Sequence, residues 1–188
     1  MIRRFVLLSM VLMAALWAQP SRGSQELKFY SDDFGGVGLC LGKGTGALGA
    51  YAYLRPVDNL GFEVAVGKRL FIVINQTYGT TEVFWPFMGT GKLQFYFSGR
   101  QARTQWGLEL GGVMAEDAGP GGEAAGTLRY RLSRNMNFDM NLGIGAFADQ
   151  EGSTLDYFIR TYGEVPEWYT FSGPPVFLMW GLGLSLSF

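Results

Sequence analysis

The chain has 188 residues, 48% of them hydrophobic, with a formal net charge of −1, one cysteine and no histidine. This length fits one domain, and the near-neutral charge gives no indication of nucleic-acid binding. Without histidine, catalysis that needs an imidazole and most zinc sites are excluded, and the single Cys40 excludes an intrachain disulfide and a CxxC pair.

The first 18 residues have the pattern of a secretory signal peptide. Arg3 and Arg4 precede an apolar run at 5–18, which is shorter than the roughly 20 residues of a transmembrane helix. A charged start, a short apolar core and small residues near its end predict export and cleavage after Ala18. The polar stretch 19–33 is then expected to be a short periplasmic lead-in.

Residues 34–188 form a series of segments in which large apolar residues alternate with small or polar ones. A period of two indicates β-strands, because successive side chains point to opposite faces of a sheet. We predict eight strands, at 34–43, 47–55, 60–67 with a possible extension through 70–75, 87–97, 104–115, 123–132, 137–147 and 176–188. No stretch after the signal peptide shows a convincing helical period.

The connections between these strands alternate in length. The even-numbered ones, at 56–59, 98–103 and 133–136, are short, whereas three odd-numbered ones are longer: a hairpin that turns near 78–81, a loop at 116–122 and the segment 148–174. Periplasmic turns and extracellular loops alternate in this way. The fold class we predict is therefore all-β, an eight-stranded antiparallel up-and-down transmembrane β-barrel over 34–188.

The polar faces of the predicted strands carry few charges, and these are balanced in sign. Because the interior of a barrel of this size is filled by side chains, unpaired charges there would be costly. We therefore expect a plugged interior, with no permanent pore, in which a charge network is formed by Glu63, Lys92, Glu109, Arg129, Arg131 and Asp139. The facing of the second strand stays open.

Other motifs are weaker. Residues 44–49 match the GxGxxG pattern, but the helix that a dinucleotide site needs does not follow, so we expect no cofactor. The loop acids lack EF-hand spacing, and we expect no metal. Aromatic residues in 148–174 are candidates for a recognition surface or for the membrane interface: Tyr157, Phe158, Tyr162, Trp168 and Tyr169.

The last strand has one large apolar face and ends on an aromatic residue: Val176, Leu178, Trp180, Leu182, Leu184, Leu186 and Phe188. It resembles the C-terminal strand of bacterial outer-membrane β-barrels. With the signal peptide, the eight segments and the loop alternation, 34–188 resembles the small barrels of the OmpA, OmpX and OmpW kind. The resemblance implies a place in the bacterial outer membrane, contact with its lipid, and recognition by the barrel-assembly machinery through Trp180 to Phe188.

By this resemblance we expect a non-enzymatic protein with a structural or surface-interaction role. One alternative is an OmpW-like conduit for small hydrophobic molecules. Another is a lipid-modifying outer-membrane enzyme, such as a lipid A deacylase or acyltransferase. Families of that kind place a histidine at the active site, and this chain has none. A last alternative is a soluble lipocalin-like carrier with its faces reversed, for which the charged residues are too sparse to cover a water-facing exterior.

Overall fold

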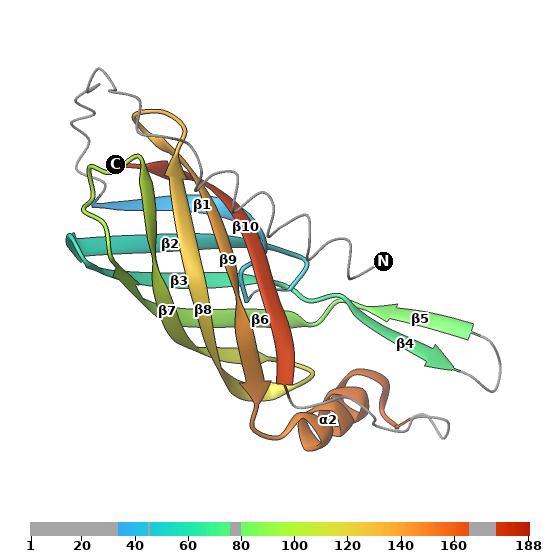
Figure 1. Ribbon diagram of the computed structural model, residues 1–188. Coiled ribbons are helices and arrows are strands. Elements are labelled where there is room, and N and C mark those ends of the chain that lie inside the picture. The colour runs from blue at the N-terminus through green and yellow to red at the C-terminus, as the bar shows by residue number, and fades with distance from the viewer. Residues whose placement is uncertain (1–33, 45, 76–79, 166–175) are drawn as a thin grey trace.

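The computed structural model describes residues 34–44, 46–75, 80–165 and 176–188; the predicted signal peptide and lead-in lie outside them. Eight antiparallel strands close into a barrel in the order β1-β10-β9-β8-β7-β6-β3-β2 (Figure 1). They are β1 (Gly35–Gly42), β2 (Leu48–Val57), β3 (Leu60–Lys68), β6 (Phe87–Tyr96), β7 (Thr104–Ala115), β8 (Gly119–Arg131), β9 (Met136–Phe147) and β10 (Val176–Ser187). The predicted fold class is confirmed as an all-β, eight-stranded closed barrel whose strands follow sequence order.

Side chains alternate between the inside and the outside of the barrel, as the period of two predicts. In β7, Gln105 and Glu109 are buried, whereas Leu108 and Leu110 are about half exposed. The facing of β2, which the sequence left open, is now fixed, because Tyr51, Tyr53 and Arg55 are buried. The outer wall is therefore apolar and the interior is polar.

The barrel closes where the first strand meets the last. β1 pairs with β10 from Gly36 opposite Ser187 to Gly42 opposite Gly181. Beyond the last paired residue, the N–H of Phe188 donates to the carbonyl oxygen of Gly35 at 3.0 Å. This closure leaves no free strand edge along the paired length.

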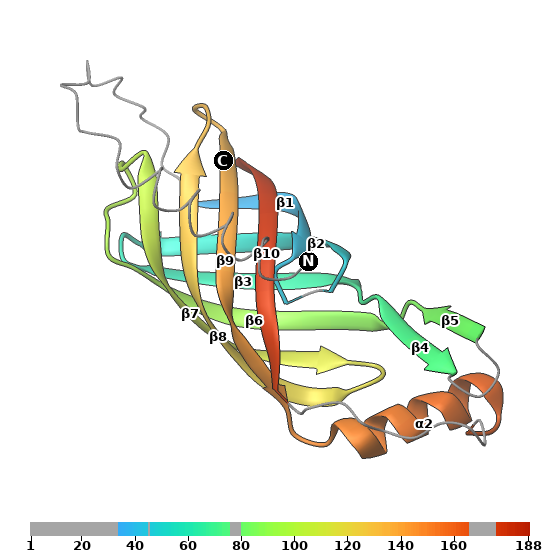
Figure 2. The same ribbon diagram turned by 45° about the vertical axis from the view of Figure 1, so that its right-hand side comes forward.

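The two ends of the barrel differ. At one end, here called the turn end, β2–β3, β6–β7 and β8–β9 are joined by short turns. At the other, here called the loop end, lie a hairpin of β4 (Phe71–Asn75) and β5 (Thr80–Phe84) and a helix, α2 (Gln150–Tyr162). Both project beyond the barrel (Figures 1 and 2). Of the hairpin turn predicted near 78–81, residues 78 and 79 lie outside the described residues, whereas Thr80 and Thr81 already belong to β5.

Two expectations about the loop end are wrong. The loop predicted at 116–122 is short, because β8 already begins at Gly119 and pairs with the end of β7. Pro120 is tolerated in that strand because it lies close to the strand's start, where a missing N–H costs little. Segment 148–174 is not all loop, since it contains α2, whose N-terminus is capped by Asp149 accepting from the N–H of Gly152.

Candidate functional site: the charged interior and the loop end

A network of ion pairs fills the middle of the barrel. The Nζ of Lys43 lies 2.8 Å from Oε2 of Glu63. The Nζ of Lys92 lies 3.1 Å from carboxylate oxygens of both Glu109 and Glu123. The amide of Asn141 donates to Glu109 at 2.6 Å. All six side chains are buried, so that each charge is compensated by a neighbour rather than by water.

A second group centres on Asp139. The Nε of Arg129 donates to its Oδ1 at 2.6 Å, and the hydroxyl groups of Tyr51 and Ser185 donate to its Oδ2. The Arg129 guanidinium also lies 3.8 Å from the ring centroid of Tyr53. This carboxylate is therefore held by a cation and two hydroxyl donors, a fixed arrangement that fills space between β2, β8, β9 and β10.

Interior side chains also hold the turn end in place. Arg55 donates through Nη2 to the carbonyl oxygen of Ser98 at 3.0 Å. Gln105 and Arg131 both donate to the carbonyl oxygen of Arg100, at 2.7 and 3.0 Å. These bonds tie the backbone of the turn between β6 and β7 to side chains from β2, β7 and β8.

The structure places all six charged residues singled out in the sequence inside the barrel, and the expected charge-paired interior is confirmed. Three further members were missed: Lys43, Arg55 and Glu123. Strand parity could have found Arg55, which shares a face with Tyr53, and Glu123, which shares one with Arg129. Lys43 could not be found in this way, because its positive φ of 50° breaks the alternation and turns the side chain inward.

The aromatic candidates of the loop end do not form one surface. Phe158 is fully buried and meets Phe84 of β5 edge-on, with ring centroids 5.6 Å apart, so its assignment to a recognition surface is wrong. Tyr162 is 53% exposed. Burial raises the pKa of Tyr157, which is half-buried beside Phe158. The remaining candidates, Trp168 and Tyr169, lie outside the described residues.

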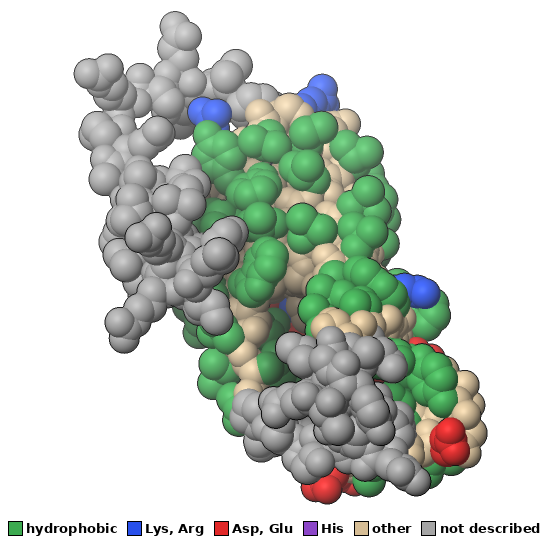
Figure 3. Space-filling model, turned by 90° about the vertical axis from the view of Figure 1, so that its right-hand side faces the viewer, with side chains coloured by type: hydrophobic (Ala, Val, Ile, Leu, Met, Phe, Trp, Pro, Cys, Tyr) green, Lys and Arg blue, Asp and Glu red, His purple; other side chains and the backbone are tan. Residues whose placement is uncertain are grey.

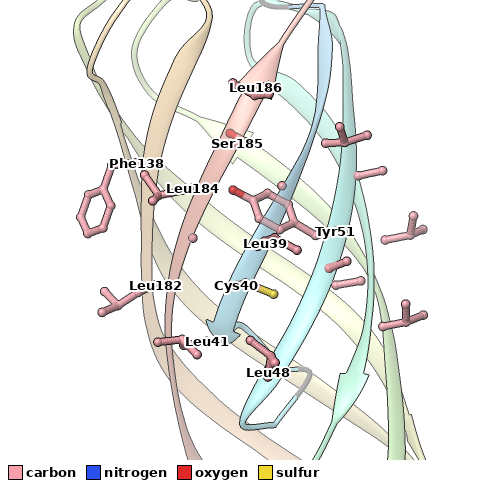
Figure 4. A pocket seen from close by; sticks show the side chains of 18 of the residues that line it. Leu39, Cys40, Leu41, Leu48, Tyr51, Phe138, Leu182, Leu184, Ser185 and Leu186 are labelled. Atoms are coloured by element: carbon pink, nitrogen blue, oxygen red, sulfur yellow. The ribbon is translucent and has the colours of Figure 1, made fainter.

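Four of the five residues singled out for barrel closure sit in β10, and the fifth, Phe188, directly follows its last residue. Leu182, Leu184 and Leu186 lie opposite β1 residues in the register, whereas Trp180 lies just past the last pair. Figure 4 shows this part of the wall, in which Leu182 and Leu184 of β10 project to the same side as Phe138 of β9, and Tyr51 lies on the other side of the β10 ribbon. Recognition of this strand by an assembly machinery stays a prediction.

Comparisons with protein-family models, with curated proteins and with solved structures find no match. Among the residues that the structure describes, no group of three or more His, Cys, Asp or Glu side chains could hold a metal ion. Within the same residues, no helix is both long and apolar enough to cross a bilayer. The segment after Gly44 leads into β2 rather than a helix, so the GxGxxG match has no dinucleotide-site geometry.

Proposed function

We propose that the chain is a non-enzymatic, integral outer-membrane β-barrel with a structural or surface-interaction role and a plugged interior. The observation that carries this proposal is the outer wall. Large hydrophobic side chains are exposed on seven of the eight barrel strands, all except β8, for example Leu39 at 68%, Val64 at 61% and Leu184 at 52%. Figure 3 shows them as a broad green surface.

A lipid environment accounts for this wall better than water does. Monomeric soluble proteins rarely expose apolar patches larger than a few hundred Å², whereas outer-membrane barrels carry an apolar band about 25 Å tall around the outside. The polar and charged side chains that a soluble carrier would present to water are here buried inside. This reversal of the faces is the argument against the lipocalin-like alternative.

The surface-interaction part of the proposal rests on the loop end. The β4–β5 hairpin and α2 extend past the barrel, and their aromatic contacts give them a definite arrangement: Phe84 packs against Phe158 and, at 5.5 Å, against Tyr162. Exposed side chains on these two elements, among them Ile72, Val83 and Ile159, are then available to other molecules at the cell surface.

The test is cellular fractionation followed by a gel with and without boiling. We expect the protein in the outer-membrane fraction and a folded band whose migration changes on heating, as a closed barrel resists detergent unfolding. Recovery from the soluble periplasmic fraction, with no heat-dependent shift, would reject the proposal.

The conduit alternative has less support. A through-path would have to cross the ion pairs of Lys43 and Lys92 and the turn that Arg55 and Arg131 hold at the turn end. We expect planar-bilayer recordings of the purified barrel to show no steady conductance. Sustained single-channel currents would instead favour the conduit.

A further inference from the structure

The seam between β1 and β10 is incomplete at the loop end. β10 pairs with β9 from Val176 onward, but with β1 only from Gly181 onward. The last link across the seam is the N–H of Lys43, which donates to the carbonyl oxygen of Trp180 at 3.2 Å. Within the described part of the chain, Val176–Met179 therefore has a strand neighbour on one side only.

The reason lies in the corner between β1 and β2. Gly42, Lys43, Gly44 and Gly46 all have positive φ values, between 50° and 89°. This left-handed run favours glycine and folds the chain into the barrel, where Lys43 reaches Glu63, instead of letting it rise beside β10. A Cβ on Gly44 would meet the carboxylate of Glu123, so a side chain there would have to displace that carboxylate.

A cavity of about 240 Å³ occupies the space that the corner leaves. We call it the seam notch; it is lined by Gly42, Gly44, Gly46, Arg69, Met88, Phe147, Phe177, Leu178, Met179 and Trp180. Its inner side chains, such as Met88 and Met179, are buried, whereas Leu178 and Trp180 are more than half exposed on the outer wall. The notch thus connects the apolar outer wall with the mouth of the interior.

The chemistry of the lining indicates the kind of ligand. Met88, Met179 and the stacked rings of Phe147 and Phe177, 4.9 Å apart, present an apolar and adaptable surface. One guanidinium stands at the rim: Arg69 lies 5.4 Å from the Phe147 ring centroid and retains 22% side-chain exposure while it pairs with Asp117. An alkyl chain suits the lining, and an oxygen-bearing headgroup suits the rim.

We propose that the seam notch binds the single alkyl chain of a fatty-acid-like amphiphile, which enters sideways from the membrane between β10 and the Gly42–Gly46 corner. An alkyl chain is the expected ligand because the notch is continuous with the apolar outer wall. It opens at Leu178 and Trp180, on the surface that lipid chains would cover. This inference rests on the proposed membrane location. It differs from the conduit alternative, because the ion-pair network closes the notch from below and makes it a binding site without an exit.

The fluorescence of Trp180 can be used to measure binding in the notch. The full chain is refolded into phosphatidylcholine nanodiscs with the other four tryptophans replaced by phenylalanine, and ω-bromododecanoate is added as a quencher. We expect Trp180 fluorescence to fall to a plateau at a low mole fraction of probe, and excess unbrominated dodecanoate to restore it. Quenching that rises in proportion to the probe and resists competition would overturn the inference.

Two substitutions provide the matched comparison. Met88→Phe with Met179→Phe fills the notch and should weaken the saturable component about tenfold, equivalent to losing about two buried methylenes. Leu184→Phe, on the same strand but away from the notch, should leave it unchanged. Equal binding by the filled variant and by Leu184→Phe would also overturn the inference.

Arg69→Gln tests the rim. It should weaken binding of ω-bromododecanoate but leave that of ω-bromododecanol unaltered.

The same samples separate this inference from the proposed function. An inserted barrel is heat-modifiable and shields Trp180 from aqueous iodide. If the barrel inserts but the quenching does not saturate, only the notch proposal fails. If the chain does not insert, both proposals fail.

Discussion

Lys92 is the cation on which the interior charge balance depends most. Its Nζ serves two carboxylates, Glu109 and Glu123, and also donates to the carbonyl oxygen of Lys43 at 3.0 Å. Lys43 itself is engaged with Glu63. Removal of the Lys92 charge would therefore leave two buried carboxylates without their closest cation.

We expect Lys92→Met to lower the free energy of unfolding by about 3–5 kcal/mol, the usual cost of breaking a buried pair from one side. Urea unfolding of the barrel in detergent micelles measures this. Lys68→Met is the matched control, because Lys68 is exposed and its Nζ lies over the ring of Phe87, 4.6 Å from the centroid; its loss should cost less than about 1 kcal/mol. Equal unfolding midpoints for the two variants would contradict the role given to Lys92.

Asp117, in the turn between β7 and β8, offers a test by titration. Burial raises the pKa of its carboxyl, and the Arg69 guanidinium at 3.1 Å opposes that shift without cancelling it. Because the pKa is higher in the folded state, this group favours folding below about pH 3.9, and the contribution is lost as the pH rises through the folded-state pKa.

We expect the ¹³Cγ chemical shift of Asp117 to titrate with a midpoint above about 3.9, the value of an unperturbed aspartate. Arg69→Gln should move the midpoint further upward, since it removes the opposing charge. A midpoint at or below the unperturbed value in the unmodified protein would show that the ion pair, and not burial, dominates.

At the scale of elements, α2 depends on one buried ring. Phe158 is fully buried against Phe84, and the hydroxyl of Thr154 donates to the carbonyl oxygen of Asp117 at 2.6 Å. These contacts join the helix to the β4–β5 hairpin and to the β7–β8 turn. The barrel itself makes few contacts with α2, so the helix should detach without unfolding the strands.

Phe158→Ala is expected to destabilise the docked helix by about 3–5 kcal/mol, the range for truncating a buried phenylalanine. Hydrogen exchange should then become fast at 150–162 and stay slow in β6–β9. Ile159→Ala, next to it but 51% exposed, should change neither region. Parallel loss of protection in the strands would mean that α2 is part of the barrel's cooperative unit.

The strands could be predicted from the sequence because each places one face inside and one outside. The helix was missed although signals exist: Asp149 as N-cap, Gly163 in the left-handed conformation after the last turn, and apolar residues at 155, 158, 159 and 162. Gly152, Ser153 and Thr154 weaken the helical pattern there. The interior pairs followed from parity, but the seam notch did not, because it depends on backbone dihedrals that strand alternation does not encode.

At the scale of the whole molecule, the proposed function depends on whether lipid or water surrounds the outer wall of the barrel. Leu110 lies in the middle of β7 and is 54% exposed, whereas Leu132, which is 47% exposed, follows β8 at the turn end. In water the two positions should tolerate a charge equally well. In a bilayer they should not, because the cost of a charge depends on depth.

We expect Leu110→Arg to destabilise the folded, bilayer-inserted barrel by about 2–4 kcal/mol and Leu132→Arg by about 0–1 kcal/mol. Denaturant titrations of the barrel in phospholipid vesicles measure both. A similar, small effect at the two positions would contradict membrane insertion and would return the soluble carrier to consideration.

The pairing of β1 with β10 also constrains the order in which the strand pairs of the barrel can form. Val37 pairs with Leu186 and Leu39 with Leu184, so that the ring joins the first described strand to the last. The other pairs of barrel strands join strands that follow one another around the barrel in sequence order, whereas this pair joins the first described strand to the last and cannot form before β10 is present. Until then the edge of β1 that β10 will cover carries unpaired backbone groups, and an exposed strand edge of this kind can pair with other chains.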